Sequence, residues 1–175
     1  IGHYAFQGCS SLEEILLPDM LTTIGGCAFS GTAIKSITIP KKITTLSNSP
    51  SGYSGEGNQF SAFKGAEHLR TIIFEDGILT IPARALKDCS QVTNVVIPDS
   101  VTTIGSYAFS GCTGLVEINI PKNVAAINSY AFSGCKQFET FNIPDSVTSI
   151  GSYIFSGCTG LTEITIPDKV TSISS

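Results

Sequence analysis

The chain has 175 residues, which is enough for one ordinary domain. Ten basic and fourteen acidic side chains give a net charge of −4. This balance disfavours nucleic acid as a partner, because nucleic acids are bound chiefly through clustered Lys and Arg. No apolar run reaches the roughly 18 residues that a membrane-spanning helix needs, so we expect no direct membrane insertion. Charged residues make up only 14% of the chain and apolar residues 42%, so a large share of the chain must be buried.

The sequence repeats itself at intervals of about 23 residues. Residues 150–172, IGSYIFSGCTGLTEITIPDKVTS, closely match residues 104–126 and 127–149. We number places within the repeat from the apolar residue that opens it. The openings are Ile1, Ile24, Leu46, Ile81, Ile104, Ile127 and Ile150, and an eighth repeat opens at Ile173. Such a period predicts a solenoid of about seven stacked coils. We expect one domain over residues 1–175, as a fragment of a longer repeat array, because the pattern is already running at both ends.

Each repeat contains a short predicted strand and a short predicted turn. The L-x-x-I-x-I pattern at places 12 to 17 alternates with the period of a strand. Pro follows at place 18 in six of the seven repeats and cannot donate to a sheet ladder, so each strand is only about 3–5 residues long. Strands this short must pair with their equivalents in neighbouring coils, as a parallel sheet. The Y-A-F-S-G-C segment at places 4 to 9 predicts one helical turn closed by Gly.

The places that are apolar in every repeat predict the core. Place 6 holds Phe in six repeats and Leu86 in the other, and place 9 holds Cys in five. Places 12, 15, 17, 21 and 1 are aliphatic or Phe, with few exceptions. Stacking the repeats turns each place into a column of similar side chains. We therefore expect a Phe column, a Cys column and several aliphatic columns inside the solenoid.

Residues 47–59, SNSPSGYSGEGNQ, interrupt the pattern between the second and fourth repeats. The segment is rich in Ser, Gly, Asn and Pro, and its one aromatic residue is Tyr53. This composition predicts a projecting loop. Two interpretations remain open: a tolerated surface insertion, and a binding loop carried by a rigid scaffold.

The strand L-x-x-I-x-I-P followed by I-G-x-x-A-F-x-G-C resembles the leucine-rich repeats of the BspA-like, or Treponema pallidum-type, class. The resemblance covers the chain outside residues 47–59. It implies an α/β fold, a right-handed β-α superhelix with a short-stranded parallel sheet on its concave face. It also implies a bacterial or protist protein that is secreted or sits on the cell surface and adheres to host matrix proteins or other cells. Repeats 2 and 3 depart from the pattern at Thr32, Ala66 and Glu75, and we expect local distortion there.

Five of the six cysteines, Cys9, Cys89, Cys112, Cys135 and Cys158, share place 9. Because they share one structural place, we interpret them as free thiols buried in a column between coils. Disulfides between neighbouring coils are an alternative, although side chains stacked in register point the same way. A metal site is disfavoured because no C-x-x-C pair is present.

The sequence predicts no enzyme and no cofactor. His3 and His68 are the only histidines and lie at different places in different repeats. Nucleophilic catalysis needs a base held beside the nucleophile, and no G-x-S-x-G, H-E-x-x-H or P-loop motif is present. The many Ser and Thr residues recur with the repeat, which is typical of turn-forming positions.

Places 14 and 16 flank the buried residue of the strand, so their side chains must point out of the sheet. The candidate protein-binding residues are those of this outward face together with the aromatic residue of the loop. They are Glu14, Leu16, Thr38, Tyr53, Thr71, Ile73, Asn94, Val96, Glu117, Asn119, Thr140, Asn142, Glu163 and Thr165. The first half of this face is partly apolar, and the second half is polar with spaced carboxylates.

These features favour a non-enzymatic protein-binding module for adhesion at a cell surface. An extended, rigid and repeated face without a catalytic set is suited to contact with a protein. The partner would be a host extracellular-matrix protein or another cell-surface protein. The alternatives are a structural spacer and an accessory repeat array of a larger surface protein or enzyme.

Overall fold

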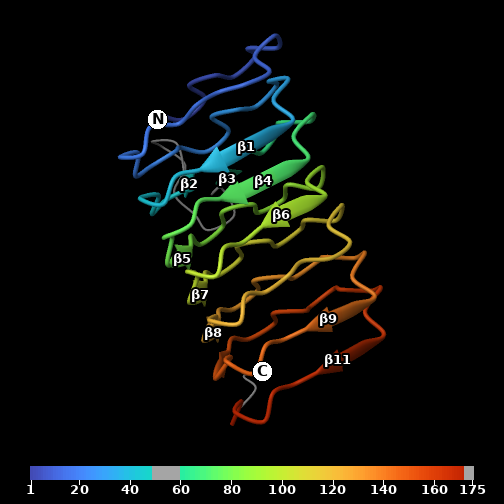
Figure 1. The fold of residues 1–175 in the computed structure, drawn as a ribbon. Helices are drawn as coiled ribbons and strands as arrows, with labels where there is room; N and C mark the ends of the chain where they lie inside the picture. Colours follow the sequence, from blue (N-terminus) through green and yellow to red (C-terminus); the bar gives the residue numbers. More distant parts are fainter. Residues whose placement is uncertain (49–59, 172–175) are drawn as a thin grey trace.

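The structure is a computed structural model that describes residues 1–48 and 60–171. The chain winds into a stack of coils that runs from the N-terminal end to the C-terminal end (Figure 1). Backbone hydrogen bonds connect every successive pair of the predicted repeats. Examples are Phe6 N to Ala28 O at 2.8 Å and Phe132 N to Ile154 O at 3.1 Å. We number the coils 1 to 7 in the order of the repeats. The predicted stacking of equivalent residues is confirmed.

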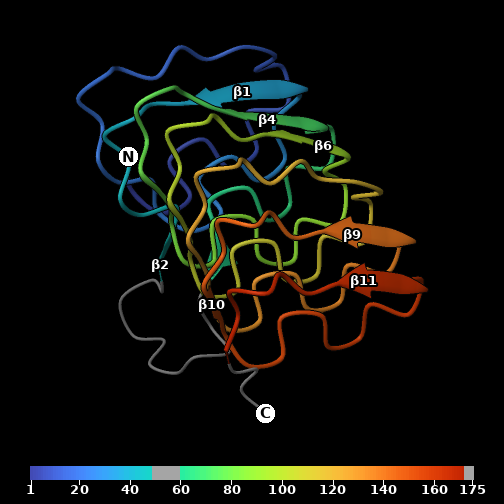
Figure 2. The same cartoon turned by 60° about the horizontal axis from the view of Figure 1, so that its bottom comes forward.

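One side of the stack carries the predicted strands, which lie along one side of the molecule in Figure 2. β1 (Ser36–Ile39), β4 (Thr71–Phe74) and β6 (Asn94–Val96) form one parallel sheet, and β9 (Thr140–Asn142) pairs with β11 (Glu163–Thr165) in another. The register joins equivalent places, for example Thr38 with Ile73 and Ile73 with Val96. We call the outward surface of these strands, and of the equivalent segments of coils 1 and 5, the strand face.

A second parallel sheet, which the sequence analysis did not anticipate, lies where each coil meets the next. It contains β5 (Thr80–Ile81), β7 (Thr103–Ile104), β8 (Ala126–Ile127) and β10 (Ser149–Ile150). Each strand has two residues, the first pointing outward and the second, an Ile, into the core. Thr23 and Thr45 continue this pairing toward the N-terminal end as an isolated parallel bridge.

The predicted helical turn is wrong, because the described residues contain no helix. In coil 5, Tyr107 has a φ of 59° and Gly111 a φ of 76°, and a right-handed helix excludes both values. Amides along the turn alternate between two acceptors. The Phe109 amide donates to Ala131 O of the next coil at 2.8 Å, and the Ser110 amide donates to Tyr107 O of its own turn at 3.2 Å. The helical part of the predicted β-α superhelix is therefore replaced by consecutive tight turns, whereas the strands are retained.

The core columns form as predicted. Phe rings at place 6 stack with centroids 5.5 Å apart between Phe6 and Phe29 and 5.3 Å apart between Phe109 and Phe132, and the interplanar angle is 6° in both pairs. Phe138 and Phe141 add two larger side chains to coil 6, and both pack against Phe132. The aliphatic columns are buried through the middle coils, from Ile24 to Val147, except at Ile118, which is partly buried.

The distortion expected in coils 2 and 3 does not occur on the strand side, where β1 and β4 pair over four residues each. Glu75, which replaces Pro at place 18, takes a structural role of its own. Its carboxylate accepts a hydrogen bond from the Lys41 amide at 2.9 Å and lies 3.9 Å from the Lys41 ammonium. The insertion begins and ends in a short antiparallel pair, β2 (Ser47–Asn48) with β3 (Phe60–Ser61).

Candidate binding surface

The strand face presents its side chains outward as predicted. Along β1 and β6 the residues alternate between exposed and buried, because successive side chains of a strand point to opposite faces. Leu16 is 98% exposed and Val96 45% exposed. Ile73 is half-buried because Thr38 and Val96 flank it on the neighbouring strands. At places 14 and 16, the exposed apolar side chains therefore lie on coils 1 to 4, and Val116, 59% exposed, lies at the neighbouring place 13 of coil 5.

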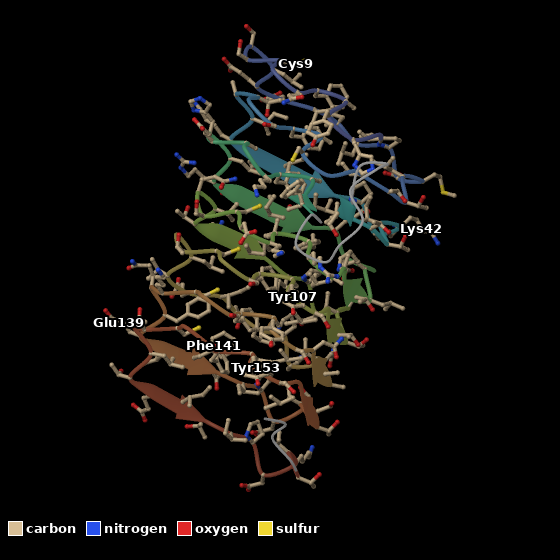
Figure 3. The ribbon with its side chains drawn as sticks, turned by 180° about the vertical axis from the view of Figure 1, so that it is seen from behind. Cys9, Lys42, Tyr107, Glu139, Phe141 and Tyr153 are labelled. Atoms are coloured by element: carbon tan, nitrogen blue, oxygen red, sulfur yellow. The ribbon has the colours of Figure 1, made fainter. Side chains whose placement is uncertain are left out.

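The C-terminal half of the strand face is polar and acidic. Glu117 and Glu163 are exposed at place 14, and Glu139 is exposed at the neighbouring place 13 (Figure 3). Lys41 with Glu75 is the one ion pair within residues 1–48 and 60–171, so these three carboxylates have no cation within 4.0 Å there. Asn119, Asn142 and Thr165 complete the outward row. This half can accept hydrogen bonds and attract cationic groups.

The strand ladder is interrupted at coil 5. Residues 116–120 belong to no strand, so they pair neither with β6 on one side nor with β9 on the other. A groove of about 440 Å³, lined by residues 94–97 and 117–119, separates the segment from β6. A comparable groove of about 430 Å³ lies between coil 1 and β1, beside Leu16. The strand face is therefore a row of ridges and open grooves rather than one continuous sheet.

The fourteen predicted binding residues divide into two groups. Thirteen lie in one outward row along the strand face, at places 14 and 16. Tyr53 lies outside the described residues, together with the rest of residues 49–59 of the predicted loop. The structure thus brings the thirteen onto one surface, and their role in binding stays a prediction.

The cysteine column consists of free thiols, as predicted. Four of the five cysteines at place 9 are buried, and Cys9 in coil 1 is exposed. Cys112, Cys135 and Cys158 each donate to the carbonyl at place 6 of the preceding coil, for example Cys112 Sγ to Leu86 O at 3.2 Å. Burial raises the pKa of the Cys89 and Cys135 thiols to about 12. These thiols therefore stay protonated and unreactive at neutral pH.

The histidines, cysteines and acidic residues form no cluster of three or more that could hold a metal ion in the part of the chain that the structure describes. His3 accepts a hydrogen bond from the Gly26 amide at 3.0 Å through Nδ1, which joins coil 1 to coil 2. His68 is exposed on coil 3. The two histidines therefore lie on different coils, and neither completes a nucleophile–base pair.

A tyrosine ladder on the turn side was missed by the sequence analysis. Tyr107, Tyr130 and Tyr153 occupy place 4 of coils 5, 6 and 7, with ring centroids 4.7 Å and 4.9 Å apart and interplanar angles of 2° and 16°. Such stacked pairs contribute about 0.5–1.5 kcal/mol each beyond their buried area. Burial within the stack raises the pKa of Tyr130, and the neighbouring Tyr107 and Tyr153 raise it further. The signal was visible in the sequence as SYAF, SYAF and SYIF at intervals of 23 residues.

This architecture, with short parallel strands stacked in register over columns of aliphatic, Phe and Cys side chains, defines a leucine-rich-repeat solenoid. The family model for the BspA-type leucine-rich repeat region matches six copies, over residues 1–50, 59–135 and 79–175. The chain therefore belongs to the BspA-type leucine-rich-repeat family. The resemblance seen in the repeat motifs is confirmed. No curated protein matches the chain.

Solved structures of bacterial leucine-rich-repeat proteins share this fold. A leucine-rich repeat protein from Bacteroides ovatus is 30% identical with a TM-score of 0.70, over 97% of this chain and 46% of that one. A leucine-rich cell surface protein from Faecalibacterium prausnitzii is 25% identical with a TM-score of 0.56, over 89% and 54%. The T. pallidum leucine-rich-repeat protein is 22% identical with a TM-score of 0.64, over 89% and 69%. The chain thus spans about half the length of the first two.

Across residues 1–48 and 60–171, no helix has the length and hydropathy that crossing a membrane requires.

Proposed function

We propose that the chain is a non-enzymatic protein-binding module that acts in adhesion at a bacterial cell surface, and that the strand face makes the contact. The observation that carries the proposal is the gathering of exposed apolar side chains, Leu16 and Val96 with half-buried Ile73, on one outward row of a rigid scaffold. Leucine-rich-repeat proteins generally mediate contacts between proteins. The similarity to a cell surface protein supports the location.

The grooves beside the strand face support this proposal further. Each groove places a backbone segment without strand pairing next to an exposed apolar side chain: Leu16 at the first and Val96 at the second. Backbone groups at an unpaired strand edge can hydrogen-bond a partner chain, while a neighbouring apolar side chain supplies buried area. A partner that spans both grooves would also contact Ile73, which lies between them in the stack.

The test compares two double variants with matched chemistry. Leu16→Asp/Val96→Asp introduces two charges on the strand face, whereas Met20→Asp/Leu79→Asp introduces them at two residues, 76% and 63% exposed, that are not outward residues of its strands. Ile73 is left unchanged, because its partial burial would mix loss of stability with loss of binding. Each protein is passed over immobilised extracellular-matrix proteins, including laminin and fibrillar collagen, and binding is measured by surface plasmon resonance.

We expect the parent and the Met20/Leu79 variant to bind at least one of these proteins equally, and the Leu16/Val96 variant to bind at least tenfold more weakly. Equal binding by all three proteins would remove the strand face from the contact. Absence of binding by the parent chain would instead favour the alternative role, a structural spacer or accessory array within a longer protein.

A further inference from the structure

The tyrosine ladder ends in two cationic side chains at its N-terminal end. Arg84 occupies the same place 4 in coil 4, and its guanidinium carbon lies 5.0 Å from the centre of the Tyr107 ring. The Lys87 ammonium lies 5.9 Å from the centre of the same ring. Cation–π attraction at these distances holds both cations beside the ladder. Figure 3 shows Tyr107 and Tyr153 in line along the stack, and we call Arg84, Lys87 and the three tyrosines the turn-side stripe.

The cations of the stripe have no anionic partner within the described residues. The only ion pair among these residues joins Lys41 and Glu75. Asp88 follows Lys87 directly in the chain and is exposed, but it lies beyond ion-pairing distance of both cations. Arg84 and Lys87 are themselves half-buried. Within the described residues, two positive charges are therefore held in place without a partner anion.

The phenolic hydroxyl groups of the three stacked tyrosines also lack hydrogen-bond partners among the described residues. Among residues 1–48 and 60–171, none of the three phenolic hydroxyl groups hydrogen-bonds another residue, and Tyr153 is 53% exposed. The rings cover each other's faces, which leaves ring edges and hydroxyl groups at the surface. A sugar that stacks on an aromatic face finds no such face between the rings. Ring edges and hydroxyl groups instead suit the mixed polar and apolar contacts of a protein.

The stacked tyrosines are preorganised for such contacts. Tyr and Arg are the side chains most enriched among residues that dominate protein interfaces, and a rigid Tyr loses little conformational entropy on binding. Each ring here is fixed by its neighbours and by a backbone φ of 58–60°. The stripe thus offers a flat, ordered surface with positive charge at one end, whereas Glu117, Glu139 and Glu163 give the strand face of the same coils the opposite charge.

We propose that the turn-side stripe is a second contact surface, separate from the strand face, and that it binds an acidic protein segment. Carboxylates of that segment would pair with Arg84 and Lys87, and its backbone or polar side chains would hydrogen-bond the row of phenolic hydroxyl groups. Charge complementarity selects the partner, because the unpaired charge on the stripe is positive while the chain as a whole carries −4.

The experiment uses the full chain and a fluorescein-labelled peptide of ten glutamates, followed by anisotropy at low ionic strength. Arg84→Gln/Lys87→Gln removes the two cations of the stripe. Lys122→Gln/Lys169→Gln removes the same charge from two exposed lysines that follow strand segments. We expect the first variant to bind at least tenfold more weakly than the parent and the second to stay within twofold. Because the chain has no Trp, tyrosine fluorescence should change on binding in the parent and much less in Tyr107→Ala.

Three results would overturn the proposal. Equally weakened peptide binding in Arg84→Gln/Lys87→Gln and Lys122→Gln/Lys169→Gln would show attraction to net charge rather than to the stripe. Undiminished binding by Arg84→Gln/Lys87→Gln would place the peptide elsewhere. Tighter binding of a sulfated oligosaccharide than of the peptide would assign the stripe to a glycan. The Leu16→Asp/Val96→Asp variant should bind the peptide normally, so failure of the strand-face proposal and failure of this one are distinguishable.

Discussion

Two regions of the solenoid hold their coils together in different ways. Across residues 24–97, β1, β4 and β6 form an unbroken ladder on the strand face. Across residues 104–166, the ladder is missing on both sides of residues 116–120 and returns only between β9 and β11. In that second region, stacked tyrosines and thiol–carbonyl hydrogen bonds connect the turn side of the coils, whereas Phe rings stack in both regions.

The outward residues of coil 5 differ from those of the unbroken ladder. The ladder runs where outward places carry residues that favour strands, such as Thr38, Ile73 and Val96. It stops where the same places carry Glu117 and Asn119, two residue types depleted in strands. Regular repetition of the buried places therefore fixes the stacking of the coils. Outward Glu and Asn do not by themselves prevent pairing, because Asn142 and Glu163 belong to the paired strands β9 and β11.

The largest expected effect tests the shared core. Phe132→Ala removes a fully buried ring that contacts Phe109, Phe138, Phe141 and Phe155. Because the surrounding rings can fill the cavity only in part, the free energy of unfolding should fall by about 3–5 kcal/mol. Phe6→Ala, at the same place in the half-open first coil, is the matched control and should cost clearly less. Urea denaturation measures the free energy of unfolding of both variants. An equal loss of stability in the two would contradict the buried column of stacked Phe rings.

The cysteine column should make stability depend on alkaline pH. Folding raises the pKa of the Cys89 and Cys135 thiols from 9.0 to about 12. The unfolded chain therefore loses these protons first, so the stabilisation is complete below pH 9 and is lost as the pH rises toward 12. At 1.36 kcal/mol per pKa unit, each thiol should account for about 2–3 kcal/mol between pH 9 and 11.

Cys89→Ala and Cys135→Ala should each flatten this pH dependence, and Cys9→Ala, at the exposed equivalent, should leave it unchanged. The free energy of unfolding at pH 8, 9, 10 and 11 gives the comparison. A pH dependence that is the same in all four proteins would show that the thiols are not buried as described.

The smallest effect concerns the interrupted ladder. Replacing Glu117 and Asn119 with Thr gives coil 5 outward residues like those of β1, and should stabilise the protein by about 0.5–1 kcal/mol. Amide hydrogen exchange over residues 116–120 should slow by a similar free energy as pairing with β6 forms. The control, Glu163→Thr, lies in a strand that is already paired and should change exchange much less. Unchanged exchange in coil 5 would mean that another feature holds the segment apart.

The sequence was sufficient to predict the stacking, the buried columns and the outward row of candidate binding residues. A period of 23 residues fixes all three, because it sets which side chains lie above one another. The helical turn was predicted wrongly because Y-A-F-S-G-C is compatible with a helix locally. Only the bonds to the next coil, such as Tyr107 N to Ser129 O at 3.0 Å, reveal that half of its amides are used elsewhere.

The gap in the strand ladder and the tyrosine ladder could not be predicted from the pattern of buried residues. The gap at residues 116–120 was not expected, because the pattern of the buried places continues through coil 5 without a break. The tyrosine ladder also lies outside the core, at a place occupied by Cys27 and Arg84 in other coils, and so was not recognised as a column. The side chains that could define a partner are thus those that the repeat constrains least.

The most direct test of the central claim, that residues 23 positions apart lie on top of one another, is an NMR measurement of contacts between the tyrosine rings. Single Tyr→Phe variants assign the ring signals. With centroids 4.7 Å and 4.9 Å apart, Tyr107 should show nuclear Overhauser effects to Tyr130, and Tyr130 to Tyr153, with none between Tyr107 and Tyr153. Absence of both neighbouring contacts, or a direct contact between Tyr107 and Tyr153, would contradict the stacked solenoid.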